Sequence, residues 1–426
     1  MLSARFTAEI RTSFRALEHR NFRLYWTGQL ISLVGTWMQS VAQGWLMHRL
    51  ADDPFMLGLL GVAQFLPVLA ISLFAGVLAD RLDKRRLLLL TQSASLVQAA
   101  VVALLASAGL MTPWLLIALA FVFGTINAFD LPARASFVAE MVSGKDLSNA
   151  IALNSAAFNA ARVVGPAVAG ILVATLGEAG CFWINAVSYF AVLAGLARMD
   201  LARRDTSHMR GRSTLSTLKE GIRYAFGVPA IRNLLLLLGF TTGFGFQYMV
   251  LLPVYAKDIL DAGPQGFGLL VSAFGLGSLL SALRMTRQLT RGDLRMNLLV
   301  GLVTAGLGML GFAWSRIFGL TLVMGFACGF GLILYVASTN TLLQITTEDR
   351  FRGRVMSLYT LMFIGTAPLG ALTAGWVAKR SGAPVATSLS AMVLLFGALW
   401  VAYRLRVLAR REAGRLTEAA PIDKEG

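Results

Sequence analysis

The chain has 426 residues, of which 56% are hydrophobic and only 14% are charged. Water-soluble proteins carry a charge on about a quarter of their residues, so this composition excludes a soluble enzyme. Roughly 240 apolar residues, at about 20 for each bilayer crossing, allow on the order of a dozen transmembrane helices. Little sequence is left for a separate folded domain. The net charge is +16, and what it means for function depends on where the basic residues lie.

Apolar runs of transmembrane length follow one another along the chain. The first six cover residues 22–49, 55–79, 87–110, 113–131, 148–175 and 179–199. After a polar stretch, six more cover residues 229–256, 264–286, 296–313, 316–344, 354–378 and 384–404. Backbone polar groups in hydrocarbon need partners within their own segment, and these runs are too long for barrel strands. The predicted fold is therefore an all-α membrane protein with twelve transmembrane helices.

The predicted organisation is two six-helix halves. The segments, in order, are a cytoplasmic N-terminal segment at 1–21, the first half at 22–199, a central cytoplasmic loop at 200–228, the second half at 229–404 and a cytoplasmic tail at 405–426. A faint internal repeat supports duplication, since SGKDLSNAIAL before the fifth span resembles TEDRFRGRVMSL before the eleventh. Equal numbers of spans then favour parallel halves related about the membrane normal, an arrangement that transporters use.

Basic residues are divided unevenly between the two predicted faces of the membrane. The two tails and the even-numbered connections carry 32 of the 38 Lys and Arg residues. The other face has five, namely Arg49, Lys257, Arg316, Lys379 and Arg380, and Arg162 lies inside a span. By the positive-inside rule, both termini are expected in the cytoplasm. The high isoelectric point is thereby explained without a nucleic-acid partner.

Polar side chains occupy one face of the first span, where successive spacings are three or four residues. They are Gln29, Ser32, Thr36, Gln39 and Gln43. In lipid, such a face points either to a partner helix or to water, so it marks a helix seam or a cavity wall. In the second half, Gln247 and Tyr248 of the seventh span correspond to it, and Asn127 of the fourth span is matched by Asn340 of the tenth. The symmetry of this set favours contact with a cargo.

The connection after the second span reads GVLADRLDKRR over residues 76–86. Gly76 permits close helix packing, and Asp80 is an acid at a helix end that can pair with Arg134 or face the N-terminus of another helix. Arg81, Lys84 and Arg85 are either part of the same contact or serve only to set the topology. We expect Asp83 to occupy a tight turn, since Asp tolerates left-handed geometry.

This connection resembles the signature between the second and third helices of the major facilitator superfamily, with Asp83 in place of a glycine. The resemblance implies a gate in which the loop holds the two halves together when the protein is open outward. We include Asp130 and Arg134 in the expected gate. Further similarity at Asn127 to Arg134, Arg223 to Arg232 and Gly353 to Met356 points to the branch that contains the enterobactin exporter and the macrolide efflux proteins.

Arg162 lies about 21 Å into the fifth span, at 1.5 Å per residue. A charge at that depth costs about 3 to more than 10 kcal/mol unless it faces water, a partner or a ligand. It is either a cavity-facing site for an anionic or polar cargo, or a buried post bonded to amides such as Asn154, Asn159 or Asn127. A third reading is that the boundaries of the span are misplaced.

The fifth span also contains Gly165, Pro166 and Gly170, and Pro166 frees a backbone carbonyl one turn earlier. This is similar to the Gly-Pro motif in the fifth helix of superfamily exporters. A plain packing kink is an equal alternative to a device specific to exporters.

The resemblance implies a secondary active transporter of the bacterial inner membrane that exports a small amphipathic molecule, drug-like or a siderophore, by alternating access coupled to protons. Asp130 and Glu140 are the deepest acids for proton exchange, although Asp130 pairing with Arg134 is the alternative. No cofactor, metal site or catalytic constellation is predicted, and the expected partners are the cargo, the bilayer and protons, with the chain acting as a monomer. Uptake of cargo, or a sensor or scaffold that transports nothing, stays open.

Overall fold

The structure is a computed structural model that describes residues 14–200, 214–285 and 290–418, without the side chains of residues 72–74, 76–81, 214–219 and 408–418. All regular secondary structure in these ranges is helical. The first bundle consists of η1 (Arg15–Glu18), α2 (Arg20–Ala51), α3 (Pro54–Arg81), α4 (Lys84–Ser107), α5 (Pro113–Met141) and α6 (Leu147–Ala197).

Helix starts in this bundle follow ordinary capping chemistry. The side chain of Thr112 accepts a hydrogen bond from the backbone N–H of Leu115, directly before Pro113 opens α5. Asp83 caps α4 by accepting from the backbone N–H of Arg86 at 3.0 Å. Asp83 lies in the short connection between Arg81 and Lys84, as expected, but with φ at −60° its backbone is extended and not left-handed. A carboxylate at this position accepts a hydrogen bond from the helix end, for which a glycine has no side-chain acceptor.

The predicted fifth and sixth spans form one element, α6, with a sharp turn at Gly177. Its φ of 72° and ψ of 175° lie in a region that is essentially restricted to glycine. At 1.5 Å per residue the 51 residues of α6 are far longer than one crossing of a bilayer. The turn therefore lets the two arms run back alongside each other.

The second bundle consists of α7 (Thr214–Gly227), α8 (Pro229–Gly245), α9 (Tyr248–Val254), η2 (Tyr255–Ile259), α10 (Gly263–Arg284), α11 (Arg291–Trp314), α12 (Phe318–Thr346), α13 (Asp349–Gly365), α14 (Ala367–Ser381) and α15 (Ala383–Glu418). The seventh and eleventh predicted spans are interrupted, not continuous. The first break is stabilised by Gln247, whose amide donates to the carbonyls of Thr242 and Gly243. The second precedes Pro368, which has no N–H to continue a helical ladder.

Ten helical stretches in the described ranges are long and apolar enough to cross a membrane, with Pro229–Ile259 and Asp349–Ser381 each counted as one. They include α6 as a single element, and helix α2 is not among them. Five polar residues, from Gln29 to Gln43, are spread along α2 and lower its hydropathy.

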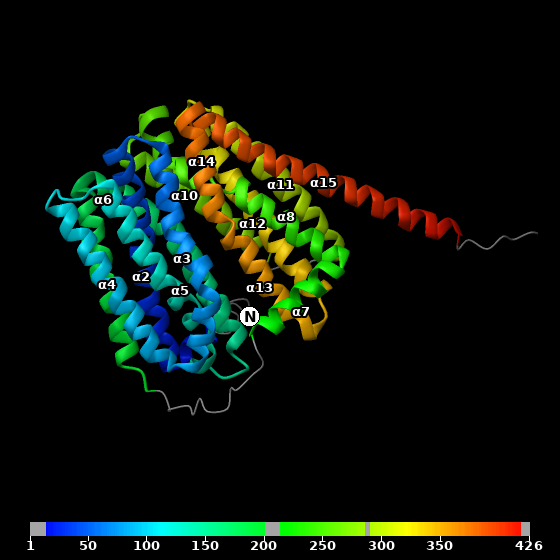
Figure 1. The fold of residues 1–426 in the computed structure, drawn as a ribbon, viewed down its shortest axis with the longest axis horizontal. Helices are drawn as coiled ribbons and strands as arrows, with labels where there is room; N and C mark the ends of the chain where they lie inside the picture. Colours follow the sequence, from blue (N-terminus) through cyan, green and yellow to red (C-terminus); the bar gives the residue numbers. More distant parts are fainter. Residues whose placement is uncertain (1–13, 201–213, 286–289, 419–426) are drawn as a thin grey trace, which may run out of the picture.

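The two bundles lean together at one end and diverge toward the other (Figure 1). We call the first the Gly177 end, since the turn of α6 and the connections α2 to α3 and α14 to α15 lie there. The opposite end, which carries α7, we call the α7 end. The largest buried core cluster combines residues of both bundles near the Gly177 end, among them Leu46, Leu251 and Phe267. The bundles thus share one apolar core where they meet.

Candidate transport pathway between the bundles

Glycines bring backbone against backbone where the bundles meet. A Cβ atom placed on Gly268 of α10 would lie 2.5 Å from the carbonyl oxygen of Pro166 and 2.7 Å from the Cα of Gly170, both in α6. On the other flank, a Cβ on Gly58 of α3 would lie 2.6 Å from the carbonyl oxygen of Ala371 in α14. No side chain fits at either crossing, so the bundles are sealed along two helix pairs.

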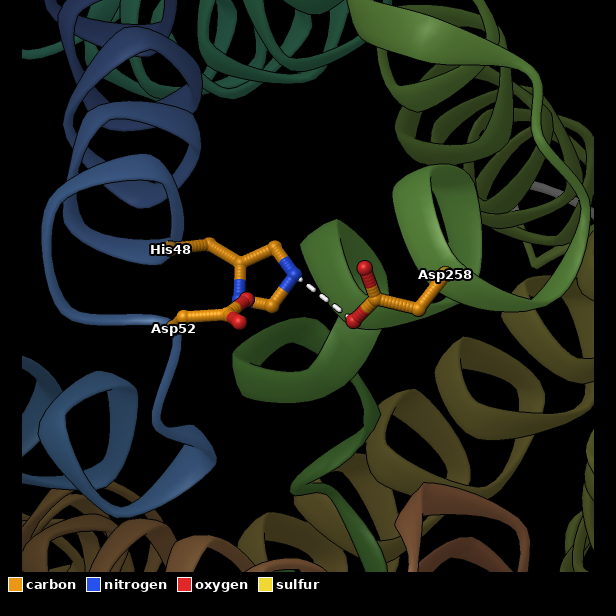
Figure 2. A group of neighbouring side chains, drawn as sticks. All are labelled: His48, Asp52 and Asp258. Carbon is orange, nitrogen blue, oxygen red and sulfur yellow. Dashed lines mark hydrogen bonds and ion pairs between the residues drawn. The ribbon is translucent and has the colours of Figure 1, made fainter.

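Three charged contacts cross between the bundles at the Gly177 end. The ammonium of Lys379 lies 2.6 Å from Asp53, and that of Lys257 lies 3.3 Å from Asp52. The third joins His48 of α2 to Asp258 of η2, with Nε2 at 2.8 Å from Oδ2 (Figure 2). Partial burial raises the pKa of Asp53, but hydrogen bonds from Lys379 and the N–H of Phe55 outweigh it, so the pKa lies below its ordinary value.

A cavity of about 440 Å³ lies between the bundles on the α7 side of this seal. Its walls come from α3, α5 and α13, and its lining includes Val68, Leu131, Ser357, Thr360 and Ile364. The walls are mainly apolar, with two hydroxyl groups from α13. Such a lining suits a molecule with a large apolar surface and few polar groups.

Arg162 lies at the boundary between the bundles, half-buried among aromatic rings. Its Nη2 donates to the hydroxyl of Tyr248 in α9 at 3.5 Å, which is long for a hydrogen bond. Its Cζ lies 5.8 Å from the ring centroid of Trp37, within cation–π range. The exposed ring of Phe158 packs edge-on against Trp37. The structure thus brings together two of the predicted cargo residues, Arg162 and Tyr248, from opposite bundles.

The amides that were considered as a buried post do not hold this side chain. Within the described residues, no hydrogen bond joins Arg162 to Asn127, Asn154 or Asn159, and the amide of Asn159 donates instead to the carbonyl of Ser155. The arginine therefore has weak, long contacts and a face toward the space between the bundles. This arrangement leaves its guanidinium available to an anionic or hydrogen-bonding group.

The polar stripe of α2 lies inside the first bundle, away from the boundary with the second. Gln39 donates to Gln98 of α4 and accepts from Asn185 of α6, while Gln43 accepts from Gln64 of α3. Thr36 donates to the carbonyl of Ser32 and is 3.5 Å from the hydroxyl of Tyr189. Gln29 is also buried, at 2% exposure. The contacts of Thr36, Gln39 and Gln43 match the helix seam, whereas neither amide atom of Gln29 has a hydrogen-bond partner.

The remaining predicted cargo residues are dispersed. Gln247 stabilises the break between α8 and α9 and lines a cavity of about 160 Å³ inside the second bundle. Asn340 of α12 accepts from Gln344 at 2.6 Å. Asn127 is half-buried on α5, next to Ala128, which lines the larger cavity. The symmetry seen in the sequence does not bring these three amides to one place.

The predicted gate residues form two separate groups in the first bundle. Lys84 contacts Glu140 at 2.5 Å, and Arg85 donates to the carbonyls of Leu196 and Ala197 at the end of α6. Asp130, at 1% exposure, forms an ion pair with Arg134 one turn later and accepts from Thr91 and Gln92 at 2.7 Å. Gly76, Asp80 and Arg81 lie in the last part of α3, where the structure describes the backbone but not the side chains.

The predicted helix-bend motif forms part of the seal. A Cβ on Gly165 would lie 2.6 Å from the Cβ of Trp37, so α2 crosses α6 there, and Gly170 faces α10. Helix α6 continues through Pro166, which has no N–H to bond the carbonyl of Arg162. The side chain of Ser272 in α10 donates to the carbonyl of Val163 at 3.0 Å. The motif thus contributes backbone contacts between the bundles.

Sequence reasoning missed the charged contacts at the Gly177 end. The structure places His48 beside Asp52 and Asp258, with one ligand atom of each within 4.8 Å of the others. A signal was present, because His48 and Asp52 are one helical turn apart at the end of the first span and Asp258 ends the seventh. Parallel halves would bring both span ends to the same face.

Comparisons with known proteins agree with this architecture. A family model described as transmembrane secretion effector matches residues 11–421. The multidrug efflux pump Tap of Mycolicibacterium fortuitum is 28% identical over 382 residues, covering 86% of this chain and 91% of that protein. The staphyloferrin A transporter of Staphylococcus aureus is 26% identical, covering 82% and 87%. The enterobactin exporter EntS of Salmonella paratyphi A is 25% identical, covering 96% of both.

Solved structures show the same fold at low sequence identity. The nucleoside transporter NupG superposes with a TM-score of 0.70 at 14% identity, covering 91% of this chain and 98% of that one. A bacterial homologue of the lysosomal transporter Spinster, in an inward-facing and unoccupied conformation, superposes with a TM-score of 0.67 at 14% identity, covering 92% and 96%.

Proposed function

Because the chain belongs to the family of transmembrane secretion effectors, in the major facilitator superfamily, we propose that it exports a small amphipathic molecule across a bacterial inner membrane by alternating access. The superfamily resemblance read from the motifs is confirmed, and the chain is a transporter, not an enzyme. The observation that carries the proposal is the family match over residues 11–421.

The proposed topology has twelve crossings with both termini in the cytoplasm. Ten helices meet the criteria of length and hydropathy. The turn at Gly177 makes α6 two crossings, and α2 is the twelfth, with Gln39 hydrogen-bonded inside the first bundle. The distribution of basic residues then supports a periplasmic Gly177 end and a cytoplasmic α7 end. With the Gly177 end sealed, the described arrangement is open toward the cytoplasm.

The cargo is proposed to meet both an apolar wall and a cationic group. The cavity between α3, α5 and α13 supports the first, and Arg162 with Trp37 and Tyr248 supports the second. A drug-like compound or a siderophore with an anionic or hydrogen-bonding group suits this pair of surfaces. The relatives named as drug and siderophore transporters support this class of cargo.

The other parts of the proposal follow from the family and from the position of the cavity between the two bundles. Proton coupling supplies the energy, and the cargo route lies within one chain, so a monomer suffices. The loop with Gly76, Asp80 and Arg81 is proposed to close the cytoplasmic end when the periplasmic end opens. The partners are then the cargo, the bilayer and protons, without nucleic acid.

Accumulation of dyes, macrolides and catechol siderophores in cells with and without the protein tests the proposal. We expect lower accumulation in cells that carry it, and loss of the difference on addition of an uncoupler. Higher accumulation would instead indicate uptake. An unchanged level across the whole panel would favour a sensor or scaffold and contradict transport of these compounds.

A further inference from the structure

We propose that His48 binds a proton that stabilises the closed periplasmic end of the transporter, which assigns a proton-dependent contact to a protein whose alternating access is itself proposed above. The three charged contacts between the bundles differ in one respect. Two of them use lysine, which keeps its charge throughout the physiological range, whereas the third uses histidine, whose charge ordinarily changes between about pH 5 and 8.

The hydrogen bonding of the imidazole shows where a second proton belongs. The Asp258 carboxylate, when ionised, can only accept a hydrogen bond, so Nε2 of His48 carries the hydrogen at 2.8 Å from it. The other ring nitrogen, Nδ1, is buried and has no hydrogen-bond partner. In Figure 2 the carboxylate of Asp52 lies on the Nδ1 side of the ring. A proton on Nδ1 therefore turns an unpartnered acceptor into a donor that faces a carboxylate.

Several charged groups surround the ring when the bundles are together. The charged groups on the surrounding elements are Arg49 of α2, Asp52 and Asp53 of the α2 to α3 connection, Lys257, Asp258 and the exposed Asp261 at the end of η2, and Glu178 of α6. Asp53 is paired with Lys379 of α14. Arg49 is paired with Glu178, at 2.8 Å, and Lys257 with Asp52. Asp258 is thus the carboxylate that contacts the ring directly, with Asp52 shared between Lys257 and His48. The histidine is 1% exposed, so separation of the bundles exposes it to water.

The direction of coupling follows from linkage. Since a protonated His48 attracts Asp258 of the other bundle, its proton stabilises the closed periplasmic end. A proton taken from the periplasm thus favours closure there and opening toward the cytoplasm. As the pH rises the imidazole loses its charge and the contact weakens, which favours the state open to the periplasm.

The same three side chains could bind a transition metal, and the structure argues against that reading. His and carboxylate groups are zinc ligands, but Asp52 is already bonded to the ammonium of Lys257, and Asp52 and Asp258 are both exposed. A resident cation would oppose the lysine charge at this place. The proton needs no rearrangement of these contacts.

The test measures closure of the Gly177 end directly, without any cargo. Spin labels are placed at Leu110→Cys and Ile317→Cys, which are exposed on connections of the first and second bundle at this end. The buried cysteines, Cys181 and Cys328, are replaced by alanine, and the full chain is studied in lipid nanodiscs with a chelator present. Distance distributions are recorded from pH 5 to pH 8.

We expect the short-distance, closed population to fall steadily from pH 5 to pH 8. His48→Gln and Asp258→Asn should each remove this dependence and leave the population at its high-pH level. His19→Gln is the matched control, since His19 also pairs with a carboxylate, Asp146, but within the first bundle. It should keep the full response of the parent protein. An unchanged pH response in both His48→Gln and Asp258→Asn, or a flat profile in the parent, would overturn the proposal.

Two further arms separate the alternatives. The first arm adds zinc ions at pH 8. If zinc restores closure in the parent but not in His48→Gln, and if closure at pH 5 is lost when chelator is present, the ligand of His48 is a metal ion and not a proton. Gly268→Val, which obstructs the seal, should open the Gly177 end at every pH. If it does so while pH has no effect, the proton site fails and alternating access stands; if neither changes the distances, both fail.

Discussion

The ammonium of Lys379 lies 2.6 Å from the Oδ2 atom of Asp53, which joins the end of α14 to the connection between α2 and α3. Because the net pKa of Asp53 is lowered, this carboxylate stays charged down to pH values below its ordinary value of about 3.9. A carboxylate whose pKa is lower in the paired state stabilises that state at every pH above the pKa of the unpaired carboxylate. This stabilisation is lost only as the pH falls through the lower pKa of the paired carboxylate. The contact is therefore insensitive to pH between 5 and 8.

We predict that Asp53→Asn lowers the closed-to-open ratio of the Gly177 end by the same factor at pH 5, 6.5 and 8. A partly exposed ion pair contributes about 0.2–1 kcal/mol, so the closed-to-open ratio should fall by up to about fivefold. The spin-label distances described above measure this ratio. Asp261→Asn, which changes an exposed carboxylate at the same end, is the control. An effect of Asp53→Asn that disappears between pH 5 and pH 8 would contradict the prediction.

Gly268→Val should prevent close packing of α6 against α10, which is one of the two helix pairs that seal the bundles together. A Cβ atom at this position would lie 2.5 Å from a backbone oxygen, and a backbone cannot move aside as a flexible side chain can. Cargo export should fall together with the closed population, while the amount of inserted protein stays near that of the parent. Gly319→Val is the matched control, because a Cβ on Gly319 has no heavy atom within 4 Å. Normal export by Gly268→Val would show that the seal is not part of the cycle.

Arg162→Gln should weaken export of anionic cargo more than export of neutral cargo. The loss of the charge removes the electrostatic attraction, while the apolar cavity keeps its shape. The measurement is a comparison of half-maximal concentrations for anionic and neutral compounds with the same purified protein in liposomes. Tyr248→Phe, which removes only the hydroxyl 3.5 Å from Arg162, should have a small effect on both. Equal losses for the two classes, or failure of Arg162→Gln to insert, would favour a structural role.

Asp130→Asn should destabilise the first bundle. Asp130 is buried and bonded to Arg134, Thr91 and Gln92, so removal of its charge leaves a buried guanidinium without a counter-ion. Breaking a buried ion pair on one side costs about 3–5 kcal/mol. Thermal unfolding in detergent measures the effect. Glu348→Gln, which breaks the exposed pair with Arg350, should shift the unfolding temperature little. A stable Asp130→Asn that loses only proton-driven export would instead assign the coupling proton to Asp130.

Gly177→Ala should lower the unfolding temperature without any steric clash. No heavy atom lies within 4 Å of an added Cβ, but φ of 72° with ψ of 175° is unfavourable for every other residue type. Strain of this kind costs about 1–3 kcal/mol. Gly144→Ala is the matched control, since its added Cβ is equally free of contacts and its φ is not positive. Equal unfolding temperatures for the two variants would show that α6 can turn without this geometry.

The sequence predicted the helices well because their cause is local. Each apolar run must satisfy its own backbone in lipid, so its length and composition indicate a helix whatever surrounds it. The pairing of Asp130 with Arg134 could be proposed for the same reason, since residues four apart share a helix face. The breaks at residues 246–247 and at Thr366 were missed because apolar composition does not report hydrogen bonding. A glutamine side chain that bonds the preceding turn makes the first of them possible.

The side that a polar residue faces was decided only by tertiary structure. Spacing placed Gln39 and Gln43 on one face of α2, but that face could meet either water or another helix, and only the packing of α4 and α6 against it made it a seam. His48 and Asp258 are 210 residues apart, and no local rule relates them. A charge buried in an apolar bundle takes its partner from whichever chain segment lies within a few ångströms. That distance is set by how two bundles dock, not by the composition of either helix.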